Sequence, residues 1–72
     1  MRLKVNGEIK ELQVEANSPS LFSIISLLVD NPHLVVVELN GEIISPEVWI
    51  NTKIKHGDCL EVVTIVGGGS YS

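Results

Sequence analysis

The sequence predicts a two-layer α+β fold, with one helix lying on one face of a mixed β-sheet. One segment has the apolar periodicity of a helix, several short segments resemble strands, and Asn-Gly or Gly-Asp dipeptides mark turns between them. A length of 72 residues suffices for one small domain. Because 44% of the residues are apolar but only 4% are aromatic, the predicted core is aliphatic.

The composition narrows the classes of function. A domain of this size buries only about 60% of the surface that its unfolded chain exposes, which disfavours a deep catalytic cavity. The formal net charge of −4 and the scattered cations Arg2, Lys4, Lys10, Lys53 and Lys55 provide no basic stripe for phosphate groups. We therefore expect neither a stand-alone enzyme nor a protein that binds nucleic acid.

The sequence also argues against membrane insertion and export. Ser23, Ser26 and Asp30 interrupt the longest apolar stretch, and a spanning helix needs roughly 18 apolar residues. The first residues alternate charged and apolar side chains, unlike a signal peptide, and a single cysteine cannot form an internal disulfide. These features predict a cytoplasmic protein without a membrane partner.

Residues 1–16 predict a β-hairpin. Apolar and polar side chains alternate over residues 1–6, and Asn6-Gly7 favours a tight turn with positive φ angles. The second strand is expected to continue to residue 16. Its apolar residues change parity along the run, which predicts a bulge or register change near Lys10-Glu11.

The next segment predicts the helix. Ser18 is the expected N-cap and Pro19 the first helical residue, because proline loses no helical hydrogen bond at that position. Asn31-Pro32 is expected to end the helix, since the residue before a proline avoids the α conformation. The apolar stripe that faces the sheet comprises Leu21, Phe22, Ile24, Ile25, Leu28 and Val29.

Two further strands follow the helix. Residues 34–39 are apolar on both faces apart from Glu38, as expected of a strand with little exposed face. Asn40-Gly41 repeats the turn signal, and residues 42–44 form a short strand. Pro46 ends regular pairing, and an irregular stretch is expected from there to residue 56.

The last part of the chain completes the predicted fold. Trp49 is expected to plug one end of the core, Gly57-Asp58 makes a turn, and residues 59–66 form a final strand that is apolar on both faces. This order of elements is typical of the ubiquitin-like β-grasp, whose last strand lies centrally beside the first. We therefore predict a β-grasp domain of four to five strands over residues 1–66 and a flexible glycine tail over residues 67–72.

Few side chains suggest chemistry of their own. Cys59 has no second cysteine to pair with and is predicted to be a small buried side chain. His33 and His56 lack the spacing of metal ligands, and the glutamates recur on hairpins and loops without an assignable pair. We predict no catalytic residue, no metal site and no bound cofactor.

The glycine run Gly67-Gly68-Gly69 allows two interpretations. It has the composition of a flexible spacer. It equally suits a thin arm without Cβ atoms that reaches into a narrow site of a partner, spanning at most roughly 10 Å. The spacing of the glycines alone leaves both interpretations open.

Residues of the second half, in their order, resemble the ThiS family. These are the ubiquitin-like sulfur carrier proteins of thiamine biosynthesis, related to the small subunit of molybdopterin synthase. The resemblance spans nearly the whole chain, although the N-terminal half matches in pattern more than in residues. Its most specific residues are Asn40, Pro46, Trp49, Gly57, Asp58 and the glycines Gly67, Gly68 and Gly69.

The resemblance implies a carrier and not an enzyme. It implies that Gly69, which forms a diglycine with Gly68, is adenylated by a ubiquitin-activating-type enzyme that uses ATP and is then converted to a thiocarboxylate. The sulfur then passes to thiazole synthase or to another sulfur-accepting enzyme. Val63 and Ile65, which lie near the arm in sequence, are the expected docking residues if their side chains are exposed.

Two features depart from the family pattern. Glu47 follows Pro46, where members commonly carry arginine, so a contact made there is expected to be absent or reversed in sign. Ser70-Tyr71-Ser72 follows Gly69, whose carbonyl is then an amide that cannot be adenylated. If this tail is native, we expect a protease that cuts after Gly69 and resembles the metal-dependent peptidases that trim certain bacterial sulfur carriers.

The resemblance leaves other functions open. Carriers with such tails also serve cysteine, methionine or natural-product biosynthesis, so the family does not fix the pathway. A ubiquitin-like modifier joined to lysines of other proteins needs the same freed diglycine. A β-grasp interaction module, by contrast, keeps its tail as a spacer that never reacts.

Overall fold

The computed structural model describes residues 1–14 and 17–65 of the chain. The predicted glycine tail over residues 67–72 therefore lies outside the described residues. The elements are β1 (Arg2–Val5), β2 (Glu8–Glu11), α1 (Leu21–Leu28), the 3₁₀ helix η1 (Pro32–Leu34), β3 (Val35–Leu39), β4 (Glu42–Ile43), the 3₁₀ helix η2 (Pro46–Asn51) and β5 (Cys59–Thr64).

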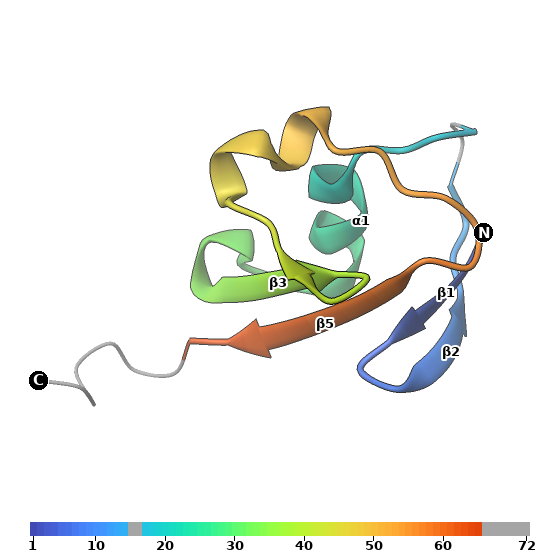
Figure 1. Cartoon of the computed structure of the whole chain (residues 1–72), viewed down its shortest axis with the longest axis horizontal. Coiled ribbons are helices and arrows are strands. Elements are labelled where there is room, and N and C mark those ends of the chain that lie inside the picture. Colours follow the sequence, from blue (N-terminus) through green and yellow to red (C-terminus); the bar gives the residue numbers. More distant parts are fainter. Residues whose placement is uncertain (15–16, 66–72) are drawn as a thin grey trace, which may run out of the picture.

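The five strands form one mixed sheet in the order β2-β1-β5-β3-β4 (Figure 1). Strand β5 pairs parallel with β1 and antiparallel with β3. The last strand therefore lies centrally beside the first, as the element order predicted. This topology, with one helix on the sheet, confirms the ubiquitin-like β-grasp.

Helix α1 covers one face of the sheet, and the core lies between them (Figure 1). The buried core residues are Leu3, Val5, Leu21, Ile24, Ile25, Val35, Val37, Trp49, Ile54 and Leu60. The other face of the sheet, which we call the open face, has no second layer among the described residues. By strand register it carries Arg2, Lys4, Ile9, Glu11, Val36, Glu38, Ile43, Cys59, Glu61 and Val63.

Both predicted Asn-Gly turns are present. Asn6 and Asn40 each have a φ of 51°, and the glycines that follow them also have positive φ, as a tight hairpin turn requires. The predicted bulge near Lys10-Glu11 is wrong, because the β1–β2 register runs without interruption from Val5↔Glu8 to Arg2↔Glu11. The chain leaves the sheet after Glu11, so the apolar residues beyond it need not keep the parity of the strand.

The helix begins two residues later than predicted. Its N-cap is Ser20, whose Oγ accepts a hydrogen bond from Ser23 N at 3.1 Å, and not Ser18. Pro19 is buried outside the helix, and its carbonyl accepts a hydrogen bond from Ile54 N at 2.9 Å. This pairing holds the backbone before Ser20 extended, so tertiary contacts override the local preference of Pro19 for a first helical turn.

The helix is also shorter than predicted, and fewer of its side chains are buried. It ends at Leu28, before Asn31-Pro32, and Pro32 instead opens η1. Phe22, predicted to face the sheet, is exposed, because the buried stripe consists of Leu21, Ile24 and Ile25. No helix in the described part of the chain is long and apolar enough to span a membrane.

Residues 46–56 are more regular than predicted, because Pro46–Asn51 forms η2. Trp49 lies within η2 and is buried in the core, as expected. Its indole N–H donates a hydrogen bond to the carbonyl of Ile44 at 2.9 Å, which satisfies the one polar group of the ring. The tryptophan thereby ties η2 to the end of the β3–β4 hairpin.

Candidate functional site

Two residues of the family signature form a polar network at the start of β5, which we call the Asn40–Asp58 network. Asp58 is buried, at 8% exposed, and its carboxylate accepts hydrogen bonds from Nδ2 of the exposed Asn40 at 3.2 Å and from Lys55 N at 2.8 Å. Asn40 Oδ1 in turn accepts from Cys59 N at 2.9 Å. These two side chains therefore fix the β3–β4 turn to the beginning of β5, which is a structural role.

The other edge of β5 is fixed by Asn6. In the strand register, β1 pairs with β5 at Lys4 and Val5, and Asn6 N donates to Leu60 O at 2.9 Å beyond them. The Asn6 side chain then continues the pairing, since its Oδ1 accepts from Val62 N at 2.7 Å and its Nδ2 donates to Val62 O at 3.1 Å. The sequence marked Asn6 only as a turn residue. Two turn asparagines thus hold β5, the strand that leads into the glycine arm.

The end of β5 presents an apolar surface on the open face. Val63 is 61% exposed and stands opposite Val36, and Ile65, which is 39% exposed, extends the pairing because its N–H donates to Leu34 O at 2.6 Å. Ile43 on β4 is also exposed and lies diagonally from Val36, because its register partner on β3 is Glu38. We call Val36, Ile43, Val63 and Ile65 the open-face patch. Val63 and Ile65 therefore meet the condition of exposure set for docking residues.

Strand β5 carries apolar side chains on both faces, as predicted, but only one face is buried, and the strand ends at Thr64 rather than at residue 66. Leu60 and Val62 point toward α1, whereas the alternate side chains Cys59, Glu61 and Val63 lie on the open face. Cys59, predicted to be buried, is consequently an exposed free thiol. Its position is set by parity, because Leu60 takes the adjacent core position.

The histidines and Glu47 lie apart from the features described above. His33 and His56 are both exposed, and His56 Nδ1 accepts a hydrogen bond from Arg2 N at 3.2 Å. Within residues 1–14 and 17–65, no group of three His, Cys, Asp or Glu side chains is placed to hold a metal ion. Glu47, the residue that departs from the family pattern, is exposed in η2, which packs against α1 and so lies away from the open face.

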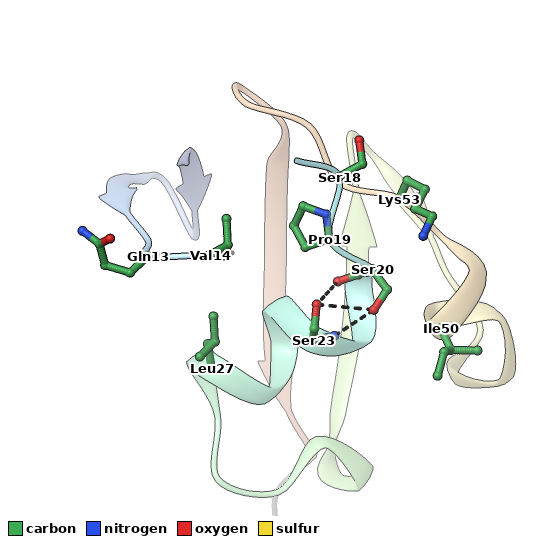
Figure 2. A pocket seen from close by; sticks show the side chains of 9 residues that line it. All are labelled: Gln13, Val14, Ser18, Pro19, Ser20, Ser23, Leu27, Ile50 and Lys53. Atoms are coloured by element: carbon green, nitrogen blue, oxygen red, sulfur yellow. Dashed lines mark hydrogen bonds between the residues drawn. The ribbon is translucent and has the colours of Figure 1, made fainter. Parts of the chain in front are cut away.

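A shallow cavity of about 580 Å³ lies beside the N-terminus of α1 (Figure 2). Figure 2 shows the serines at the start of the helix between Val14 on one side and Ile50 and Lys53 on the other. The described residues that line it include no carboxylate, histidine or thiol, and none belongs to the open-face patch. The cavity is therefore separate from the surface that borders the arm.

The comparisons with known proteins agree with this arrangement. The model of the ThiS family matches residues 3–69, which is nearly the whole chain. The chain belongs to the ThiS family. The matched segment runs through Gly67, Gly68 and Gly69 and stops before Ser70-Tyr71-Ser72.

Two solved structures support the assignment to ThiS, and one curated relative is similar in sequence. A crystal structure of the thiamine biosynthesis protein ThiS from Geobacter metallireducens is 37% identical, with a TM-score of 0.80 over 96% of this chain and 100% of that one. A solution structure from the same organism is 36% identical, with a TM-score of 0.78 over 96% and 88% of the two chains. An uncharacterized protein of Trieres chinensis, ycf40, is 36% identical over 74% of this chain and 73% of its own.

Membership in the ThiS family identifies the class of the protein. ThiS proteins are small sulfur carriers, which are acted on by an adenylating enzyme and by a sulfur-accepting enzyme and are not themselves catalysts. This agrees with the distribution of residues in the structure, where the signature side chains Asn40 and Asp58 stabilise the fold and exposed apolar side chains lie on the strand that precedes the arm in sequence.

Proposed function

We propose that this ThiS-family chain carries sulfur as a thiocarboxylate on Gly69 for the formation of the thiazole of thiamine. The observation that carries the proposal is the family match, which extends through the glycine arm and ends at Gly69. The names of the two Geobacter structures, both thiamine biosynthesis proteins, favour the thiamine pathway over other sulfur-transfer pathways. The proposed arm is Gly67, Gly68 and Gly69.

The proposed chemistry takes place at the carboxylate of Gly69. A carboxylate oxygen attacks the α-phosphorus of ATP bound by the partner enzyme, and pyrophosphate leaves. Hydrosulfide (HS−) then attacks the acyl-adenylate carbonyl, and AMP leaves, because the phosphate makes a good leaving group where a bare oxygen does not. The new C–S bond replaces the C–O bond to AMP, and loss of the S–H proton gives the thiocarboxylate. The carrier itself binds no cofactor in this scheme and contributes only the acyl group.

The proposal requires a free carboxylate at Gly69. In the 72-residue chain that carbonyl is joined to Ser70, so a protease, which we propose to be metal-dependent, removes Ser70-Tyr71-Ser72 first. We place these steps in the cytoplasm, since the exposed free thiol of Cys59 suits a reducing compartment.

We propose that the open-face patch docks the adenylating enzyme. Replacing Val63 by glutamate is expected to weaken binding of that enzyme about tenfold or more, because a charge at the centre of an apolar interface must be desolvated. The stability of the domain should change by no more than about 0.5 kcal/mol, since the side chain is 61% exposed.

The matched control for this substitution is Ile50→Glu. Ile50 is 62% exposed, almost the same as Val63, but lies in η2 and not on the open face. Titration calorimetry with the adenylating enzyme of the same organism would measure both affinities. Equal affinities for the Val63→Glu and Ile50→Glu variants would contradict docking through the open-face patch.

The proposed function as a whole is tested by the intact mass of the protein from its native cells. We expect loss of the mass of Ser70-Tyr71-Ser72 together with the increase that replacement of one oxygen by sulfur produces. An unshortened and unmodified chain, recovered from cells that are making thiamine, would contradict a carrier role. Attachment to lysines of other proteins would give products of higher mass and would indicate a modifier instead.

A further inference from the structure

Two carboxylates face each other on the open face without a cation between them. Glu38 on β3 and Glu61 on β5 are direct partners in the strand register. Directly opposite side chains have Cβ atoms only about 5 Å apart, and like charges at that separation destabilise the sheet. Glu38 is also half-buried, so its carboxylate has lost part of its hydration.

The nearby cations do not neutralise this pair. The described residues form three ion pairs, in which the N-terminal amine and Arg2 bind Glu11 and Lys10 binds Glu8. Hydrogen bonding to the N-terminal amine, with the charges of that amine and Arg2, holds the pKa of Glu11 below its usual value. Lys4 is the remaining cation on the open face; it lies diagonally from Glu61, since its register partner is Cys59, and the described residues show no ion pair between Lys4 and Glu61.

The position of the carboxylate pair links it to the docking surface. The next register pair of β3 and β5 on the open face, two residues along each strand, is Val36 and Val63 of the open-face patch. On the far side of Glu38, the register partner on β4 is Ile43, also of the patch. The two carboxylates are therefore bordered on two sides by apolar side chains that the proposed interface would cover.

We infer that the adenylating enzyme inserts a basic side chain, an arginine, between Glu38 and Glu61 when it covers the open-face patch. The inference rests on the proposed function, because it names the chemistry of that same partner. A planar guanidinium can donate hydrogen bonds to both carboxylates at once, which the single ammonium group of a lysine does less well. The two carboxylates repel each other in the free carrier, whereas in the complex each of them attracts the guanidinium.

The charge of the carrier supports a basic partner over a second copy of the chain. Each copy has a formal net charge of −4, so face-to-face association of two copies adds repulsion to the carboxylate pairs. A partner with a basic residue is instead attracted by the negative charge of the carrier. The acidic pair then acts mainly in selecting the partner, since charge complementarity governs specificity and association rate.

The test compares neutral variants of the pair in the full chain. Glu38→Gln and Glu61→Gln are each expected to weaken binding of the same organism's adenylating enzyme about tenfold, measured by calorimetry at low salt. The same variants should raise the melting temperature by about 2 °C, because they remove like-charge repulsion from the free sheet. Raising the salt concentration should weaken the unaltered complex more than the variant complexes, through screening.

The control is Glu42→Gln, which removes the same charge from an exposed residue of β4. Glu42 pairs with Leu39, whose side chain lies on the core side of β3, so it does not belong to the open face. This variant should bind the enzyme as the unaltered chain does. If Glu42→Gln lost as much affinity as Glu61→Gln, the loss would be explained by the net charge of the chain alone, and the inference would be overturned.

Other outcomes separate this inference from the proposed function. If Glu38→Gln and Glu61→Gln bind with unaltered affinity and salt dependence while the chain ending at Gly69 is still adenylated, the carrier role stands and the arginine contact is wrong. If the variants instead change the oligomeric state of the free chain, measured by analytical ultracentrifugation, the pair serves self-association and the inference is overturned.

Discussion

Replacing Gly69 by valine in the chain that ends there is expected to abolish adenylation while the domain stays folded. The reacting carboxylate must approach the α-phosphorus of ATP within a narrow site, and a branched side chain beside it displaces the carboxylate. Displacement by about 1 Å costs on the order of 10²-fold in rate. Gly68→Val is expected to act in the same way, and pyrophosphate exchange would measure both.

The folded state provides the control for these glycine variants. The last strand, β5, ends at Thr64, and Gly68 and Gly69 follow it only later in the sequence. The melting temperature of both variants should therefore match that of the unaltered chain. Normal adenylation of either variant would mean that the arm does not enter a confined site, and would favour a spacer.

The fold was predictable because its turns are encoded locally. A tight hairpin turn requires positive φ at two consecutive residues, and Asn6-Gly7 and Asn40-Gly41 are dipeptides that adopt it readily. With the turns placed, the single amphipathic helix and short connections leave few topologies, among which the β-grasp puts β5 beside β1. The order of the strands thus followed from features that lie close together in the sequence.

The errors arose where distant residues decide the local structure. The helix begins at Leu21 because Pro19 pairs with Ile54, which lies 35 residues away in the sequence. Cys59 is exposed because its neighbour Leu60 occupies the core position, and an apolar run on both parities does not reveal which parity is buried. Neither outcome could be deduced from the segment alone.

In the candidate site, too, local features could be predicted and contacts between distant residues could not. The glycine arm and the proposed docking residues Val63 and Ile65 were predicted from a resemblance and from their proximity in sequence, and the structure shows both Val63 and Ile65 exposed. The Asn40–Asp58 network and the clamp of Asn6 on Val62 were not foreseen, because their partners are separated by 18 and 56 positions. Residues that carry the family resemblance can therefore stabilise the fold rather than take part in the reaction.

Replacing Asp58 by alanine is expected to lower the free energy of unfolding by about 2 kcal/mol, or the melting temperature by about 10 °C. The substitution leaves the Lys55 N–H and the Asn40 side-chain amide without their acceptor in a partly buried position. Asn40→Gly, which keeps the positive φ of the turn, removes the other half of the network. Denaturant unfolding of the single and double variants would measure both losses.

The double variant distinguishes a shared network from two separate contacts. The losses from Asp58→Ala and Asn40→Gly should sum to about 1 kcal/mol more than the double variant shows, because the two side chains share a hydrogen bond. The matched control is Asn6→Gly, which also keeps a positive φ but shares no hydrogen bond with Asp58. Its loss of stability should add to that of Asp58→Ala within about 0.5 kcal/mol.

At a temperature where the Asp58→Ala variant is fully folded, its adenylation rate should equal that of the unaltered chain, since Asp58 is only 8% exposed and stabilises the fold. A slower rate in the folded variant would instead assign Asp58 a contact with the enzyme.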